Sequence, residues 1–443
     1  MLYVLLVGLI FELVFCYYAF KRDLFSPSAI LCEVFILSTV ACIYNADTWG
    51  VNLGLETLIV ILGGNAVFIA VSTVIHRLFG KKHAHIENEQ REDLKYIDIG
   101  FFRLLLVMVV YVIFSIIYAK TVMTILGSLT NSGDFTQAMA AFRSESFSGD
   151  VGLPDWLTKA NLLLGIGVYV LLYVFINNII VDRKKKSNYL LLIAIIAYLV
   201  SSIFTAQRTT ILLAFIYIIF VAYSLLNRKY QFIQKLNIKY LFRAIVALVL
   251  FLGLFSASRG LFGRKGEVSI IDNVTYYMGN SIESLDLFIK EPLESRQFGE
   301  ETLRQFRIYL SKFGLAEETT MQTSNLEFRI DANGNRAGNV YTGYRYYLHD
   351  FGLFGVLIFQ IITAIFYSTW YERTRGRRLK NGIDLSLILF AWFILELFRF
   401  SMMARLFDSL AAFLFTYWYI FLFWKIFLEF KVSLRSKINE NSR

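Results

Sequence analysis

Long apolar runs separated by charged segments make up most of the chain. A helix needs about 20 apolar residues to cross the hydrocarbon core of a bilayer. Segments that approach or reach this length run over residues 2–20, 28–45, 55–76, 101–119, 160–181, 189–206, 210–226, 244–258, 346–370, 384–402 and 408–429. A transmembrane barrel would instead show segments of about ten residues with alternating polarity. The pattern predicts an all-α polytopic membrane protein with about eleven transmembrane helices.

Basic residues are concentrated in every second segment between the apolar runs. This basic set comprises Lys21-Arg22, 77–98, 183–186, 228–243, 373–380 and 431–443. Short loops rich in Lys and Arg stay in the cytoplasm. We therefore expect an external N-terminus and a cytoplasmic tail at 431–443. Eight helices then lie within residues 1–258, which include an external loop at 120–159, and three lie within 346–430. A large external loop at 259–345 separates the two groups.

The overall composition agrees with a bilayer environment. Hydrophobic residues make up 57% of the chain, whereas soluble domains are about 45–50% apolar. The net charge of +10 would suggest nucleic acid as a partner of a soluble protein. Here the basic residues lie in predicted cytoplasmic loops, where they orient helices and contact anionic lipid headgroups. We expect the lipid bilayer as a partner and no nucleic acid.

Cysteine and histidine show no spacing typical of a metal site. Cys16, Cys32 and Cys42 all lie in the first two apolar segments, and the pair His83 and His85 lies in a charged loop. A solvated loop explains this pair better than metal binding does. We expect neither a metal nor another cofactor.

The predicted external loop 259–345 is rich in arginine and tyrosine. Positive charge is scarce on that side of most membrane proteins, although long loops cross regardless of charge. Arginine suits phosphate, because its planar guanidinium donates two parallel hydrogen bonds and keeps its charge. We therefore expect an anionic ligand outside the membrane. The candidate arginines, in this loop or at external helix ends, are Arg208, Arg259, Arg345, Arg399 and Arg405.

Two of these arginines have acidic neighbours that offer another role. Glu396 and Arg399 are three residues apart on a predicted helix and can form an ion pair, as can Arg405 with Asp408. Arg208 has no acidic residue within four positions. An unpaired charge at membrane depth is costly, so the sequence favours ligand binding for Arg208. For Arg399 and Arg405 both roles stay open.

The densest polar and aromatic cluster runs from Gly338 to Gly355. It contains His349, the only histidine on the predicted external face, followed by Asp350. A histidine at a helix entrance among arginines can act as a general base toward a sugar hydroxyl. Alternatively, both residues cap or anchor the helix. The spacing of Gly352 and Gly355 allows close contact with another helix.

Several of these features together resemble the Wzy-type polymerases of bacterial O-antigen and capsule assembly. They are the number of predicted spans, the late external loop, and two short motifs. The first motif, Phe-Thr-x-x-Arg, ends at Arg208. The second combines Asn-Val-Tyr-Thr at 339–342 with Asp-Phe-Gly-x-x-Gly at 350–355. The resemblance covers the whole chain in plan, but only these motifs in sequence.

This resemblance implies a metal-independent glycosyltransferase with a GT-C-like plan in the bacterial cytoplasmic membrane. Its substrates are oligosaccharide repeat units linked to undecaprenyl diphosphate, which it polymerises on the outer face, and a Wzz-type chain-length regulator is an expected partner. The five arginines would bind the diphosphate, and His349 or Asp350 would activate the acceptor hydroxyl. Aromatic side chains would stack on sugar rings, namely Tyr341, Tyr344 and Trp156.

Two other functions remain open from the sequence. An O-antigen ligase shares the donor and the plan but transfers the glycan to the lipid A core; the two motifs favour the polymerase. A flippase or other transporter for lipid-linked oligosaccharides would show two related halves and short loops. The asymmetric loop at 259–345 argues against a transporter.

Overall fold

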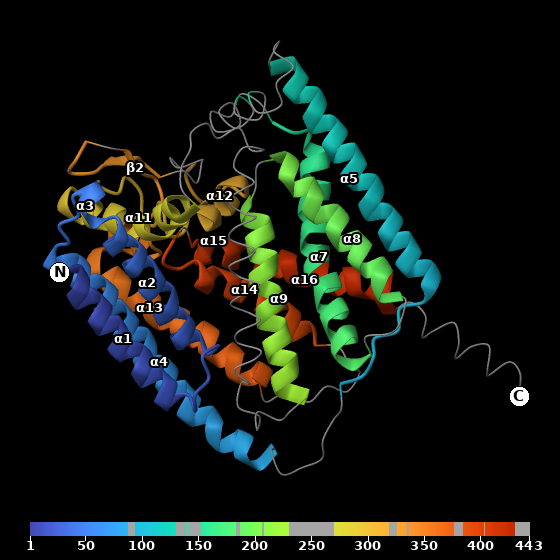
Figure 1. Cartoon of the computed structure of the whole chain (residues 1–443), viewed down its shortest axis with the longest axis horizontal. Helices are drawn as coiled ribbons and strands as arrows, with labels where there is room; N and C mark the ends of the chain where they lie inside the picture. The colour runs from blue at the N-terminus through green and yellow to red at the C-terminus, as the bar shows by residue number, and fades with distance from the viewer. Residues whose placement is uncertain are drawn as a thin grey trace, which may run out of the picture. The chain divides into compact units, whose positions relative to one another are not determined.

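The computed structural model describes residues 1–86, 94–129, 137, 141, 152–182, 187–205, 208–229, 270–318, 326–334, 336–375, 384–402 and 404–429. Most of them form helices (Figure 1). Among these residues, 7 helices are long and apolar enough to cross a membrane, and three shorter helices are also apolar. The prediction of a helical membrane protein is confirmed. The count of eleven spans stays a prediction, because the segment 244–258 lies outside the described residues.

The chain divides into two compact units. The first comprises Met1–Glu89, Val268–Arg377 and Phe393–Phe413. The second comprises Gln90–Glu267, Arg378–Trp392 and Leu414–Arg443. The sequence predicts 259–345 as a separate external loop. Its described part instead packs with the helices of the first unit.

Four long helices form the body of the first unit. They are α1 (Leu2–Ala19), α2 (Pro27–Tyr44), α4 (Leu55–Ile86) and α13 (Tyr344–Arg375), which lie side by side in Figure 1. At one end of this bundle Asp23 accepts a hydrogen bond from the Tyr371 hydroxyl at 2.6 Å. His76 Nδ1 lies 2.6 Å from Glu372 Oε1 at the same end. These buried polar contacts join the loop between α1 and α2, and also α4, to the C-terminal end of α13.

The opposite end of the first unit is covered by one long helix, α11 (Ile270–Lys290), and several short elements. The short elements are α3 (Ala46–Trp49), α12 (Arg304–Lys312), the antiparallel strands β1 (Arg329–Ile330) and β2 (Arg336–Gly338), and α15 (Leu406–Ala411). Figure 1 shows α3, α11 and β2 together at this end. The charge pattern of the sequence predicts that this end is external. We call it the loop end.

Helix α11 is the main connection between the loop end and the bundle. It packs against α2 so closely that a Cβ on Gly279 would lie 2.5 Å from the Cys42 backbone nitrogen. Asp286, also on α11, accepts hydrogen bonds from the Gly54 N–H at 2.8 Å and the Thr57 hydroxyl at 2.5 Å. The polar segment thus folds back onto the helices through buried contacts.

Helix α13 is broken near its start by Gly352. The backbone there has φ 61° and ψ −155°, a conformation that is essentially restricted to glycine. A Cβ on Gly355 would lie 2.6 Å from the Tyr347 carbonyl oxygen, while a Cβ on Gly352 would meet nothing within 4 Å. Among the described residues, the near neighbours of Gly355 lie in α13 itself, so the contact with another helix that this spacing allows is not made. The two glycines permit the break, which sets the first turns of α13 apart from its long apolar part.

The second unit is built from α5 (Phe101–Leu129), α7 (Asp155–Val181), α8 (Ser187–Ser201), the 3₁₀ helix η1 (Ser202–Thr205) and α9 (Arg208–Lys229). Residues of α14 (Leu385–Phe398), α16 (Phe413–Phe423) and the π-helix η3 (Trp424–Glu429) complete it. A buried ion pair of 2.6 Å joins Arg228 of α9 to Asp384. Both α5 and α7 extend into the predicted loop 120–159, which leaves residues 130–154 between them.

Candidate functional site

A narrow cleft at the loop end, with a volume of about 10 Å³, brings together three chain segments that are distant in sequence. The segments are the turn before α12, the first turn of α13 and the approach to α15. The residues that line it are Glu301, Thr302, Tyr346, Tyr347, Ala404, Arg405, Leu406, Phe407 and Asp408. Two acidic residues, Glu301 and Asp408, and one arginine, Arg405, belong to this lining, and all of it lies within the first unit.

Asp350 holds the first of these segments against α13. Its carboxylate accepts hydrogen bonds from the backbone N–H groups of Glu301 at 3.1 Å and Thr302 at 2.6 Å. The Ser295 hydroxyl donates to the same carboxylate at 3.3 Å. Thr302 adds a hydrogen bond from its hydroxyl to the Tyr346 carbonyl at 2.9 Å. These contacts match the anchoring role that the sequence left open for Asp350.

The segment before α15 is held by two further carboxylates. Asp408 pairs with Arg304 at 2.7 Å and accepts the Gln305 N–H at 3.2 Å. Glu396 forms an ion pair with Arg399 and accepts the Arg405 backbone N–H at 2.9 Å. Of the two roles that the sequence left open for Arg399, the structure therefore shows the ion pair with Glu396. Asp408 pairs with Arg304, a partner the sequence did not indicate.

Glu301 has the most unusual electrostatic environment in the cleft. It is 9% exposed, and its Oε2 lies 2.8 Å from Arg345 Nη1. Burial raises the pKa of Glu301 to about 8; Arg345 opposes this rise, while Asp350, Glu327 and Glu300 add to it. A carboxyl with such a pKa can accept a proton near neutral pH, which an ordinary surface glutamate does poorly.

Arg345 is fully buried and contacts acidic side chains on two sides. It contacts Glu301 at 2.8 Å and Glu327 at 3.3 Å, and its guanidinium lies 3.6 Å from the centre of the Phe288 ring. Burial tends to raise the pKa of Glu327, but Arg345 and hydrogen bonds from Arg329 and Tyr341 lower it overall. Diphosphate binding by Arg345 stays a prediction, and this packing does not support it.

His349 lies beside the cleft residues without a close hydrogen bond to them. Its Nε2 is 3.5 Å from Glu301 Oε1 and 3.8 Å from Glu300 Oε2. Its Nδ1 is buried and has no hydrogen-bond partner among the described residues. The imidazole adjoins Glu301 but does not line the cleft, so its role as a general base stays a prediction.

The three aromatic residues predicted to stack on sugars lie in different surroundings. Tyr341 is 1% exposed and Tyr344 is fully buried, with its hydroxyl 2.7 Å from Asn65 Oδ1. A ring enclosed by protein offers no face to a sugar, so the packing does not support these two predictions. Trp156 is 58% exposed at the start of α7, in the second unit. The side chain of Arg208 and the whole of Arg259 lie outside the described residues.

Replacement of Asp350 by alanine should lower the stability of the protein by on the order of 2–3 kcal/mol, because two buried N–H groups lose a charged acceptor. We expect a lower midpoint of thermal unfolding in detergent and less protein in the membrane, with activity falling in proportion. Asp155→Ala, which removes an exposed aspartate at the start of α7, should leave the midpoint unchanged. Lost activity at a normal midpoint would instead assign Asp350 to the chemistry.

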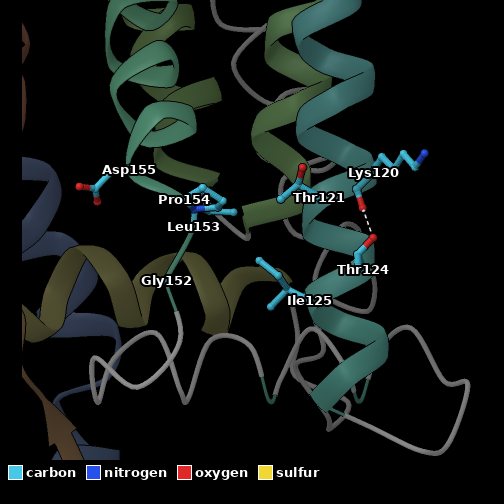
Figure 2. Close-up of a pocket in the computed structure, with 8 residues that line it drawn as sticks. All are labelled: Lys120, Thr121, Thr124, Ile125, Gly152, Leu153, Pro154 and Asp155. Carbon is cyan, nitrogen blue, oxygen red and sulfur yellow. Dashed lines mark hydrogen bonds between the residues drawn. The ribbon is translucent and has the colours of Figure 1, made fainter.

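A second hollow, of about 640 Å³, lies in the second unit between α5 and the start of α7 (Figure 2). Ile125, Gly152, Leu153 and Pro154 form part of its lining. Figure 2 shows the Lys120 amine and the Asp155 carboxylate pointing away from each other. The residues drawn there bring no pair of charged groups together, and we therefore place the candidate site in the cleft around Glu301.

Within the described part of the chain, no three His, Cys, Asp or Glu side chains gather in a way that could hold a metal ion. The sequence matches no protein-family model, and searches of the curated proteins and of the solved structures found no match either. Fold and site together define a helical membrane protein with a polar cleft among the elements that cover one end of a helix bundle.

Sequence reasoning missed Glu301 and Arg304. Glu301 is one of two adjacent glutamates in an acidic and basic stretch, a pattern that usually marks a solvated surface. Only the fold shows that a hydrogen bond to Asp350 holds the Glu301 backbone against α13. Arg345 then lies next to the Glu301 carboxyl group. The sequence did identify Arg405, which lines the same cleft.

Proposed function

We propose that this protein is a glycosyltransferase of the bacterial cytoplasmic membrane that polymerises oligosaccharide repeat units linked to undecaprenyl diphosphate, for O-antigen or capsule. The observation that supports the proposal is the cleft, in which the Glu301 carboxyl and the Arg405 side chain line one space at the loop end. The resemblance of the sequence motifs to Wzy-type polymerases supplies the substrate class. A Wzz-type chain-length regulator is the proposed partner.

In the proposed reaction Glu301 is the base. Its carboxylate takes the proton of a hydroxyl group on the acceptor sugar, and that oxygen forms a bond to the anomeric carbon of the donor glycan. The bond between this carbon and the diphosphate oxygen breaks, and undecaprenyl diphosphate leaves with the electron pair. The pKa of about 8 supports this role, because it brings the proton affinity of Glu301 close to the working pH.

Arg405 has the proposed role of stabilising the departing diphosphate. Negative charge develops on the phosphate oxygens as the bond breaks, and a positioned guanidinium stabilises this charge. Glu396 holds the Arg405 backbone in place, so that its position does not depend on the ligand. Diphosphate binding by Arg208 and Arg259 stays a proposal that rests on the sequence alone, because both residues belong to the second unit.

Purified protein in proteoliposomes, supplied only with undecaprenyl-diphosphate-linked repeat units, tests the proposal. We expect a ladder of lengthening glycans and release of undecaprenyl diphosphate, and we expect both to persist in excess chelator. Product that appears only when lipid A core is added would point to the ligase. Movement of the lipid-linked unit across the bilayer without a new glycosidic bond would point to a transporter. Either of these results would overturn the proposal.

A further inference from the structure

Helix α12 is amphipathic, but it is attached to the protein through its polar side. Arg304, in its first turn, forms the ion pair with Asp408, and the Arg307 guanidinium donates a hydrogen bond to the Phe298 carbonyl at 3.0 Å. These two arginines lie on the same side of the helix, since they are three residues apart. A surface helix of a soluble protein places its apolar side inward instead.

The apolar side of α12 is exposed. Its residues recur at the helical spacing of three to four positions and continue past the end of the helix. Their exposed fractions are Phe306 38%, Tyr309 38%, Leu310 42%, Phe313 79% and Leu315 74%. An exposed apolar surface formed by so many large side chains calls for a partner that is itself apolar.

This exposed surface continues onto the membrane-facing side of α13. Phe298 is 75% exposed, and its ring contacts that of Phe351 with a centroid distance of 5.1 Å. Just past the break at Gly352 come Leu353 and Phe354, which are 62% and 69% exposed on a helix long and apolar enough to cross a bilayer. Phe298, bonded through its carbonyl to α12, thus links the apolar side of α12 to a surface that faces lipid.

We propose that α12 and the adjoining residues 313–315 lie in the headgroup layer of the bilayer, with their apolar side chains inserted at the boundary of the acyl chains. Interfacial helices combine such an apolar face with basic residues that approach lipid phosphates. The exposed Lys312 near the C-terminal end of α12 fits this arrangement. The inference is independent of the proposed function, because it rests only on the surface of α12 and its continuity with α13.

Spin labels at single introduced cysteines test the proposal in proteoliposomes. The wild-type chain is the background control, because Cys16, Cys32 and Cys42 are fully buried. Leu310→Cys and Phe313→Cys report on α12. Phe354→Cys is the control for a lipid-facing site, and Ala332→Cys, at the exposed tip of the strand pair, is the control for a site in water.

We expect the labels at 310 and 313 to collide readily with oxygen and to be protected from a water-soluble nickel reagent. The ratio of the collision rates with oxygen and with the nickel reagent should place both labels about 5–10 Å below the headgroups. Two results would overturn the proposal. In one, the nickel reagent reaches these labels as readily as the label at 332. In the other, neither reagent reaches them, which would mean that protein covers α12, whether from this chain or from a second copy.

Discussion

Replacement of Glu301 by glutamine should reduce polymer formation by about 10²–10⁴-fold, the usual contribution of a positioned general base. The glutamine keeps the size and most of the hydrogen-bonding capacity of the side chain but cannot accept the proton of the acceptor hydroxyl. The measurement is the initial rate of glycan elongation in proteoliposomes, at matched protein content. The amount of donor bound should change little, because the base acts on the acceptor.

Glu300→Gln is the matched control for this substitution, since it changes the neighbouring carboxyl, which does not line the cleft. Its rate should stay within a few-fold of the wild-type rate. A normal rate for Glu301→Gln would exclude Glu301 as the base. His349 would then be the leading candidate for this role. Failure of the wild-type protein to elongate glycans would count against the proposed function instead.

The raised pKa of Glu301 also has a consequence for stability that does not depend on activity. Its folded-state pKa is about 8, against an ordinary value of 4.5. Glu301 therefore favours folding below its unfolded pKa, and this contribution is lost as the pH rises through about 8. Wild-type stability should fall between pH 5 and 9, and Glu301→Gln should weaken this fall. In the Glu301→Gln variant, part of the fall in stability should remain, because burial also raises the pKa of Glu283 to about 7.

Hydrophobic pattern alone located the helices because each transmembrane segment must satisfy its own backbone hydrogen bonds within lipid. The ends of the helices were harder to locate. Helix α5 continues to Leu129 and α7 begins at Asp155, since polar residues at an interface can extend a helix that the hydropathy pattern ends early. The break at Gly352 was also hidden, because glycine is common in transmembrane helices for several reasons.

The candidate site was predicted only in part, because a polar residue in a loop looks the same in sequence whether it is buried or exposed. Arg345 and Tyr341 were assigned to ligand binding, but the fold places Arg345 between Glu301 and Glu327, with Tyr341 nearby. Both carboxylates are distant from Arg345 in sequence. The helical pattern at 301–313 predicts α12, but the same limitation concealed the exposure of its apolar side.

Replacement of Arg405 by alanine should lower the rate of elongation by about 10²–10³-fold, because one donor to the developing phosphate charge is lost. Arg405→Lys should recover only part of this rate, since an ammonium group keeps the charge but lacks the planar fork that binds two phosphate oxygens. The measurement is the rate at saturating donor, together with the thermal unfolding midpoint of each variant. The midpoints should fall only modestly, because the contact from Glu396 to the Arg405 backbone is kept and the side-chain hydrogen bond with Tyr346 is lost.

Arg307→Ala is the matched control for Arg405→Ala. Arg307 is another arginine of the loop end, but it donates to the Phe298 carbonyl and does not line the cleft. Its loss should leave the rate of elongation within a few-fold of normal. Equal losses in both variants would mean that elongation depends on general positive charge at this end and not on a guanidinium in the cleft. A normal rate for Arg405→Ala would remove Arg405 from the site, leaving Arg208 and Arg259 as the candidates for binding the diphosphate.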